Sequence, residues 1–371
     1  MVVTEKSAVP ERRGRSCTSI DRLAAAADRS GTWQGVRIPN LRECLYVAPT
    51  TVCNLKCRFC AHSRSSIVKQ CMPLELFTDV IEKACGYGFA TFGLTPLLGE
   101  PLLDPCFPEK LEVLERHPAV RSYSFATNLT VASPSLLSGV SRLHKLRYLS
   151  ISLYGHDPES FSRVAGAPAQ LFFDVLGHLE RLSEWPAMAG HVELRIRTTA
   201  PFQPERCHPR LRELLGELAG RKVRIRVPED RYSNWSGLIS PGDVADLGIR
   251  LKPESPKTTI PCAFLFYKHT VLPDGRLNAC YGDDGETTMV IGDLTRQRFE
   301  EIYSLRNNRY IALLLSQMKG RWKRSCRACT GYRGVNDHHY SYAFHEKPFL
   351  TLSEFMGMLE PPDRPPEEAV C

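Results

Sequence analysis

Short apolar runs recur along the middle of the chain, and stretches with helical spacing of apolar residues separate them. The strand-like runs lie at residues 45–48, 90–95, 120–126, 146–154, 192–198 and 223–227. The clearest helical pattern covers Leu76 to Ala84 and ends at Gly86, a residue type that suits a helix C-terminus. Further helical patterns lie at about 111–114, 136–143, 171–182 and 211–218. This alternation predicts parallel βαβ units with right-handed crossovers.

About six such units are fewer than the eight that close a full barrel, so we expect an α/β fold with a partial (β/α)6 barrel. After Pro228 the alternation stops, and a smaller unit begins near Cys262. There two β-rich runs flank Asp274-Gly275, which is typical of a two-residue hairpin loop and would pair Cys280 with His269. Helical patterns follow at 298–304 and 308–318. The predicted divisions are an extension (1–40), the barrel (41–245), a small domain (246–335) and a tail (336–371).

Composition narrows the class of protein. The 371 residues are 43% hydrophobic and 24% charged, which indicates a globular chain. No apolar run approaches the roughly 20 residues of a bilayer span, and no secretory signal is visible, so we expect a cytoplasmic protein without membrane contact. The net charge of +7 is spread along the chain without a basic, aromatic-rich stripe, so no nucleic-acid partner is predicted.

Fourteen cysteines carry the strongest chemical signal. In a reducing compartment thiols serve more often as metal ligands or catalysts than as disulfide partners. Cys53, Cys57 and Cys60 form a C-x3-C-x2-C run directly after the first predicted strand, at the catalytic face of a (β/α) barrel. Three thiolates can hold three irons of a 4Fe-4S cluster and leave the fourth iron open. The alternative is zinc with His62 as fourth ligand, although zinc sites usually show two separated pairs.

This run, with Phe59 before its last cysteine, resembles the radical S-adenosylmethionine (SAM) superfamily. The resemblance implies that the open iron binds SAM, and that SAM is cleaved to methionine and a 5′-deoxyadenosyl radical that abstracts a substrate hydrogen atom. It also implies that Phe59 packs near the adenine. Gly99 and Glu100 lie in a Gly-Glu-Pro segment that resembles the family's site for the SAM ammonium, with Leu98 in place of the first Gly.

Three further positions resemble SAM-contacting residues of the family. Asn128 follows the third predicted strand, in Thr-Asn-Leu where many members have Thr-Asn-Gly. Ser152 lies on the fourth predicted strand, and Arg163 matches an arginine further along. Ordinary turn and surface chemistry is the alternative for each of the three.

A second group of cysteines follows near the C-terminus: Cys262, Cys280, Cys326 and Cys329. Four thiolates that include a C-x2-C pair also describe a zinc ribbon, and their spacing alone leaves iron and zinc nearly even. The surrounding sequence resembles the shortened SPASM fold called a twitch domain. That resemblance implies one auxiliary 4Fe-4S cluster, which would transfer electrons or help to position the substrate.

Both cysteine groups and the Asn-Trp-Ser-Gly segment at 234–237 resemble radical SAM dehydrogenases of aminoglycoside pathways, which include the scyllo-inosamine dehydrogenase of butirosin biosynthesis. This implies oxidation of a secondary alcohol on a sugar or aminocyclitol to a ketone. The auxiliary cluster would accept the second electron, and a flavodoxin or ferredoxin would act as external donor. Asn234 and Trp235 would bind substrate. Trp235 replaces an arginine of those enzymes, and Arg231 is an alternative.

Oxidation of an alcohol also needs a proton acceptor, for which the candidates are Tyr46, Tyr154, Arg231, His338 and His339. Two other functions stay open. Maturation of ribosomal peptides is typical of many SPASM proteins, although the N-terminal extension is short for a peptide-recognition domain. Epimerisation or dehydration of a sugar-derived metabolite is the other. Epimerisation needs a free thiol, and the spare cysteines considered for it are Cys71, Cys85, Cys106 and Cys207.

Overall fold

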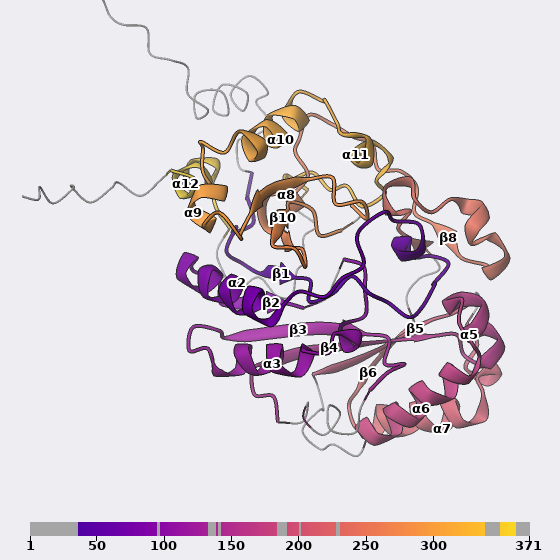
Figure 1. The fold of residues 1–371 in the computed structure, drawn as a ribbon. Coiled ribbons are helices and arrows are strands. Elements are labelled where there is room, and N and C mark those ends of the chain that lie inside the picture. Colours follow the sequence, from indigo (N-terminus) through magenta and orange to yellow (C-terminus); the bar gives the residue numbers. More distant parts are fainter. Residues whose placement is uncertain are drawn as a thin grey trace, which may run out of the picture.

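The computed structural model describes residues 36–94, 97–132, 139, 142–183, 191–199, 202–227, 231–282, 284–337 and 349–360. Its centre is a nine-stranded sheet of order β11-β10-β9-β1-β2-β3-β4-β5-β6 (Figure 1). Neighbouring strands from β1 to β6 are parallel. These strands are β1 Leu45–Val47, β2 Thr91–Gly93, β3 Ser122–Thr127, β4 Leu146–Tyr154, β5 Val192–Arg197 and β6 Arg224–Arg226. The predicted α/β fold with a partial (β/α)6 barrel is confirmed.

Helices pack against the parallel strands through their apolar faces. They are α2 Leu74–Tyr87, α3 Phe107–Arg116, α5 Pro158–Ala165, α6 Gln170–Ser183 and α7 Pro209–Gly220. In α2 the buried face includes Phe77, Val80 and Ile81, as the spacing predicts. The helix runs past Gly86 and ends at Gly88, whose φ of 102° suits glycine, so the predicted end was two residues early. The predicted helix at 136–143 lies largely outside the described residues.

The C-terminal part continues the same sheet. β9 (Thr270–Val271) pairs in parallel with β1, and β10 (Arg276–Asn278) and β11 (Val290–Asp293) follow in antiparallel order. The hairpin lies where predicted, but its loop has three residues, because the Leu272 N–H donates to the Arg276 carbonyl (2.8 Å). Val271 therefore pairs with Leu277 and Thr270 with Asn278. The predicted pairing of Cys280 with His269 is wrong by one residue.

Short helices complete this part of the chain: α8 Phe264–Tyr267, α9 Phe299–Ile302, α10 Asn308–Met318, α11 Arg324–Ala328 and α12 Leu352–Met358. A small parallel pair, β7 (Arg231–Tyr232) and β8 (Arg250–Leu251), precedes them. The apolar core is continuous between the two parts, since the ring of Tyr87 lies 5.8 Å from that of Phe299 and 5.5 Å from that of Tyr303. Among the helices described, none is both long enough and apolar enough to span a bilayer.

The C-terminal end of α5 fixes the cysteine loop, which we define as residues 53–60. The carbonyls of Val164 and Ala165 accept hydrogen bonds from the backbone N–H groups of Arg58 (3.1 Å) and Lys56 (2.9 Å). Gly166 then takes a left-handed conformation with φ of 59°. A Cβ at this position would lie 2.6 Å from the Lys56 carbonyl oxygen, so only glycine lets the helix end approach the loop so closely.

We therefore expect Gly166→Ala to lower the free energy of unfolding by about 1–2 kcal/mol from the left-handed backbone alone, with a further loss from the clash with Lys56. Gly86→Ala is the matched control, because an added Cβ there meets nothing within 4 Å and the position is helical. The control should be neutral or stabilising by up to about 1 kcal/mol. Chemical denaturation of both variants measures the difference, and equal effects would contradict the assignment.

Candidate active site

A cavity of about 300 Å³ lies at the carboxyl ends of β1 to β5, and we call it the cysteine cavity. Cys53, Cys57 and Cys60 all line it. Burial raises the pKa of each thiol, that of Cys53 to about 11, and the neighbouring thiolates raise the pKa values of Cys53 and Cys57 further. Such thiols lose their protons readily only when a positively charged centre binds and stabilises the thiolates. The donor set therefore fits a metal cluster.

The neighbourhood of the three thiols fits a cluster better than a single zinc ion. The His62 Nε2 is hydrogen-bonded to the Thr51 carbonyl (3.0 Å), so this nitrogen is committed to the backbone. Within the described part of the chain, no three His, Cys, Asp or Glu side chains converge as ligands of one ion would. A four-iron cluster needs less convergence, because each iron takes a thiolate of its own.

The Gly-Glu-Pro segment lies across the cavity from the thiols. A Cβ on Gly99 would lie 2.6 Å from the Thr50 carbonyl oxygen, and Gly99 has a φ of 137°, so glycine is required here. Glu100 is 2% exposed and its carboxylate accepts hydrogen bonds from Thr127 Oγ1 (2.6 Å) and the Asn128 N–H (2.6 Å). Burial raises the pKa of Glu100 to about 7 despite these bonds. A cation in the cavity would offset that desolvation.

Four other predicted residues, Phe59, Asn128, Ser152 and Tyr154, also line the cysteine cavity. The Asn128 amide donates to Asn54 (3.3 Å) and lies 4.0 Å from the Cys53 sulfur. Leu129, at the position of the family's glycine, takes the left-handed φ of 54° that glycine would adopt without strain. The rings of Phe59 and Tyr154 lie 5.6 Å apart.

The structure does not bring every predicted residue to this cavity. The Arg163 side chain is exposed and donates to the Asp246 carbonyl (2.6 Å). The carbonyls of the next two residues, Val164 and Ala165, accept the hydrogen bonds from the cysteine loop. Arg231 is exposed on β7 and lines none of the cavities described here. His338 and His339 lie outside the described residues.

Residues 234–237 form a bridging segment between the two groups of cysteines. The Trp235 indole N–H donates to the Phe59 carbonyl (2.9 Å) within the cysteine loop, and Trp235 lines the cysteine cavity. The Asn234 amide donates instead to the Ala328 carbonyl (2.7 Å), between Cys326 and Cys329. Trp235 and Ser236 have φ values of 50° and 56°, a strained conformation for non-glycine residues that these contacts enforce.

The second group of cysteines lies beyond this segment. Cys262, Cys280, Cys326 and Cys329 line one pocket together with Ser236 and apolar side chains. Gln317 of α10 is 1% exposed; its amide oxygen accepts from the Cys262 N–H (2.8 Å), and its Nε2 lies 3.6 Å from the Cys326 sulfur. Burial raises the pKa of Cys326 to about 12. Four thiols fit a fully ligated four-iron cluster, and Gln317 is an orienting residue that the sequence did not reveal.

A second cavity of about 410 Å³ occupies the barrel interior, and we call it the barrel chamber. It shares Ala126, Ser152 and Arg197 with the cysteine cavity, so the two adjoin. Inward positions on β3 and β4 carry small residues such as Ser124 and Ser150, which leaves space that bulky side chains fill in an ordinary barrel. Tyr46 also lines the chamber and stacks on Tyr281 at 3.8 Å.

Sequence reasoning missed several residues of the barrel chamber. Arg197 lines both cavities, with its guanidinium 5.5 Å from the centre of the Phe59 ring. The alternation of Glu193, Arg195 and Arg197 with apolar residues along β5 could have indicated side chains that face the barrel interior. Lys268, Arg147 and Cys44 also line the chamber, and no motif marks them.

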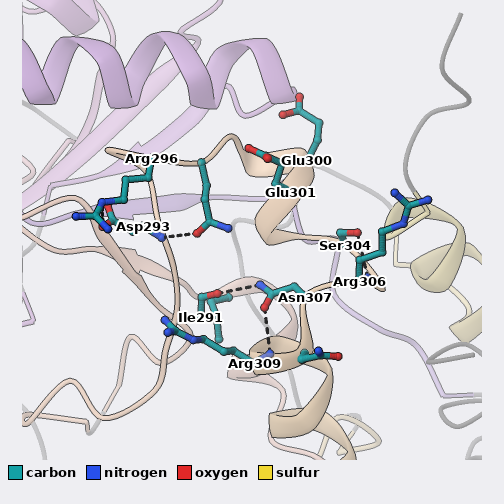
Figure 2. Close-up of a pocket in the computed structure, with 11 residues that line it drawn as sticks. Ile291, Asp293, Arg296, Glu300, Glu301, Ser304, Arg306, Asn307 and Arg309 are labelled. Atoms are coloured by element: carbon teal, nitrogen blue, oxygen red, sulfur yellow. Dashed lines mark hydrogen bonds and ion pairs between the residues drawn. The ribbon is translucent and has the colours of Figure 1, made fainter.

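A larger hollow, of about 690 Å³, lies elsewhere, beside β11, α9 and α10 (Figure 2). Its polar side chains are partly engaged with one another and with the backbone: Gln297 accepts from the Asp293 N–H (3.0 Å) and Asn307 donates to the Ile291 carbonyl (2.8 Å). No cysteine lines it. We place the active site at the cysteine cavity and the barrel chamber, where the reactive side chains gather.

Comparison with protein families agrees with this placement. The model of the radical SAM superfamily matches residues 47–184, and that of SPASM, an iron-sulfur cluster-binding domain, matches residues 262–330. The chain therefore carries a radical SAM domain. More particularly, it combines that domain with a C-terminal SPASM domain. The first domain implies a 4Fe-4S cluster and SAM, and the second implies auxiliary iron–sulfur chemistry.

Two solved structures illustrate the likeness. BtrN in complex with AdoMet and 2-DOIA is 17% identical, with a TM-score of 0.53 over 82% of this chain and 99% of BtrN. Streptococcus suis SuiB bound to the precursor peptide SuiA is 12% identical, with a TM-score of 0.51 over 91% of this chain and 81% of SuiB. At these identities the likeness shows a shared fold. A search of curated protein sequences finds no match.

Iron content tests the two cysteine groups separately. Anaerobically reconstituted protein should hold about eight iron atoms per chain, because each group supports one four-iron cluster. Changing Cys53, Cys57 and Cys60 together to Ala should leave about half of that iron and abolish SAM cleavage. Cys85→Ala is the control, since Cys85 lines neither cysteine site and should keep the full content. Stoichiometric zinc without iron would refute both cluster assignments.

We expect Glu100 to bind the SAM ammonium. Loss of a hydrogen bond to a charged group costs about 1.5–3 kcal/mol, so Glu100→Gln should weaken SAM binding by one to two powers of ten. Equilibrium dialysis with labelled SAM measures this change. Glu109→Gln, at an exposed position in the first turn of α3, is the control and should bind SAM normally. Unchanged affinity in folded Glu100→Gln protein would remove the assignment.

Proposed function

We propose that this protein is a radical SAM dehydrogenase that oxidises a secondary alcohol of a sugar or aminocyclitol to a ketone. The observation that carries the proposal is the polar barrel chamber adjoining the cysteine cavity. Its volume of about 410 Å³ lies within the range of about 300–1,000 Å³ that small-molecule pockets occupy. Serine, tyrosine and arginine side chains line it, and these suit the many hydroxyl groups of a polyol.

The two groups of cysteines would hold two four-iron clusters. When bound, SAM and these clusters supply the removal of the carbinol hydrogen atom and an acceptor for the electron that remains. The chain's own residues have positioning roles. Ser152 and Arg197 lie where the two cavities adjoin and would orient the carbinol carbon, while the bridging segment at 234–237 ties the cysteine loop to the C-terminal cysteines. An external flavodoxin or ferredoxin would reduce the protein.

Tyr46 is the residue that we assign to acceptance of the hydroxyl proton, and it would do so as the tyrosinate, since the neutral phenol already carries its own proton. It lines the barrel chamber, and Gly93 on the adjacent strand leaves room for its ring, since a Cβ there would lie 2.5 Å from the Tyr46 ring. Tyr154 lies in the cysteine cavity and forms a hydrogen bond to Cys57. Arg231 is exposed. Tyr46 thus has the best access to a polyol in the chamber.

A specific observation supports epimerisation as a second candidate function. An epimerase returns a hydrogen atom to the substrate from a nearby thiol, and Cys44 lines the barrel chamber. The thiols considered from the sequence, those of Cys71, Cys85, Cys106 and Cys207, are absent from the chamber lining. Cys44→Ala therefore separates the two functions: it would stop an epimerase and spare a dehydrogenase.

The decisive experiment incubates reconstituted enzyme, SAM and reductant with a panel of sugars and aminocyclitols in deuterated water, and separately with peptides. Dehydrogenation should yield a product about two mass units lighter than its substrate, with one 5′-deoxyadenosine formed per product, because the substrate is oxidised and SAM is consumed. Tyr46→Phe should slow product formation while SAM binding stays normal. Mass spectrometry and chromatography measure both quantities.

Each alternative leaves a different trace in this experiment. Solvent deuterium at an inverted carbon, without net oxidation and dependent on Cys44, would replace dehydrogenation by epimerisation. Modified peptides with every sugar untouched would assign the protein to peptide maturation. Either result would overturn the proposed reaction.

A further inference from the structure

We infer that the substrate carries an anionic group, a carboxylate or a phosphate, which binds between Lys268 and Arg147 at the end of the barrel chamber remote from the cysteines. We call this end the chamber floor, and its other residues are Glu43, Cys44, Thr91 and Ser122. The inference rests on the proposed function in one respect, since it takes the barrel chamber as the substrate site.

Strand register places these residues at the same end of the barrel. Tyr46 of β1 pairs with Thr270 of β9, so Cys44 and Lys268, each two residues earlier, come at the same level. Thr91 pairs with Ser122 at the amino ends of β2 and β3. Arg147 is the second residue of β4. The cysteine loop follows β1 at its carboxyl end, so the chamber floor and the cysteine cavity lie at opposite ends.

The charges that line the barrel chamber favour an anion. Four residues with cationic side chains, Arg147, Arg195, Arg197 and Lys268, line the chamber together with one acidic residue, Glu43. The charge of Arg195 is balanced by Glu193 on the same strand, a 1% exposed carboxylate to which the Arg195 Nε donates. The remaining cations outnumber Glu43. A cavity with such an excess of one sign concentrates ligands of the opposite sign.

Among these cations, Lys268 is distinguished by its burial among aromatic rings. Its ammonium lies 5.4, 5.5 and 5.3 Å from the ring centres of Phe264, Tyr267 and Tyr281, so aromatic groups surround it on several sides. Burial among them lowers the pKa of Lys268 to about 8. An anion beside the ammonium would offset this desolvation and raise the pKa again, so anion binding and protonation of Lys268 should be coupled.

Two hydroxyl groups of the floor provide an independent observation. The Oγ1 of Thr91 and the Oγ of Ser122 are buried and have no hydrogen-bond partner among the described residues. Ser122 is only 8% exposed, and both residues line the chamber. Leaving a buried donor unpaired is unfavourable. The oxygen atoms of a carboxylate or phosphate would accept hydrogen bonds from both hydroxyl groups.

The dimensions agree with a small acidic sugar derivative. Along β3, Ala126 lies four positions after Ser122 of the floor, where the chamber adjoins the cysteine cavity. At a rise of about 3.3 Å per residue this is roughly 13 Å. A hexose or cyclitol ring with its anionic substituent held at the floor would therefore extend its far carbons toward the cysteine cavity.

A binding experiment without turnover tests this inference. Reconstituted holoenzyme with SAM, kept without reductant, is titrated calorimetrically with glucose, glucosamine, glucuronate, glucose 6-phosphate and inorganic sulfate. Glucuronate and glucose 6-phosphate should bind at least about tenfold more tightly than glucose, and glucosamine should bind no better than glucose. The relative affinity of the two acidic sugars distinguishes a carboxylate from a phosphate site.

Variants locate the anion. Lys268→Met should remove the preference for acidic over neutral sugars, Arg147→Met should act in the same direction, and Lys268→Arg should retain the preference. Lys319→Met, at an exposed position after α10, is the matched control and should change nothing. Thermal unfolding of each variant verifies that it is folded.

Proton uptake gives a readout specific to Lys268. Near pH 8, glucuronate or sulfate should bind with uptake of up to about half a proton, because Lys268 with a pKa of about 8 is half protonated there and the anion raises that pKa. The other titratable or charged groups around it are Glu43, Cys44, Arg147, Tyr267, Tyr281 and Arg333. Titrations in two buffers of different ionisation enthalpy measure the uptake, and Lys268→Met should abolish it.

The outcomes separate this inference from the proposed function. Lys268-dependent binding of sulfate or acidic sugars, with no sugar oxidised, would support the anion site and refute the dehydrogenase. Oxidation of neutral sugars, with no difference in affinity between glucose and glucuronate, would do the reverse. Tighter binding of glucosamine, equal effects of Lys268→Met and Lys319→Met, or no binding of any anion would overturn the inference.

Discussion

The buried backbone of the cysteine loop needs hydrogen-bond partners that the loop cannot supply itself, and the surrounding structure provides them. The loop has no regular secondary structure between β1 and Cys60. Its Lys56 and Arg58 N–H groups donate to the end of α5, and its Phe59 carbonyl accepts from Trp235. The Val52 carbonyl, directly before the loop, accepts from the Glu100 N–H. Buried polar groups are costly when unpaired. The need to pair these backbone groups therefore holds three distant segments at the loop: the end of α5, Glu100 and Trp235.

The same requirement explains the unusual backbone conformations around the site. Gly166 and Gly99 touch the carbonyls of Lys56 and Thr50 too closely for any side chain. Trp235 and Leu129 adopt left-handed conformations in spite of their side chains. Strain of this kind persists only where contacts on several sides enforce it. The loop thus presents its three thiols on a rigid support, which suits the binding of a cluster.

Sequence patterns predicted the six barrel strands because buried parallel strands read as short apolar runs. The cysteine spacing singled out two groups of cysteines, each of which lines one pocket in the structure. The hairpin register failed because Pro273 belongs to the loop, which the Asp-Gly dipeptide alone does not reveal. Motif matching also pointed to Arg163 and Asn234. The Arg163 side chain donates instead to the Asp246 carbonyl, and the Asn234 side chain donates to the Ala328 carbonyl, between Cys326 and Cys329. No sequence pattern marked Lys268 and Arg147, because only the folded sheet brings the strands next to them into one chamber. Long-range pairing, such as that of β9 with β1, has no local signal.

That pairing has a consequence for the order of events during synthesis. One edge of β1 pairs with β2, but the other edge pairs with β9, where Tyr46 lies opposite Thr270, more than two hundred residues later in the chain. Until the ribosome has released that segment, β1 presents an open edge, and open edges invite pairing with other chains. The thiols next to this edge therefore reach their final surroundings only after β9 has been synthesised and has paired with β1.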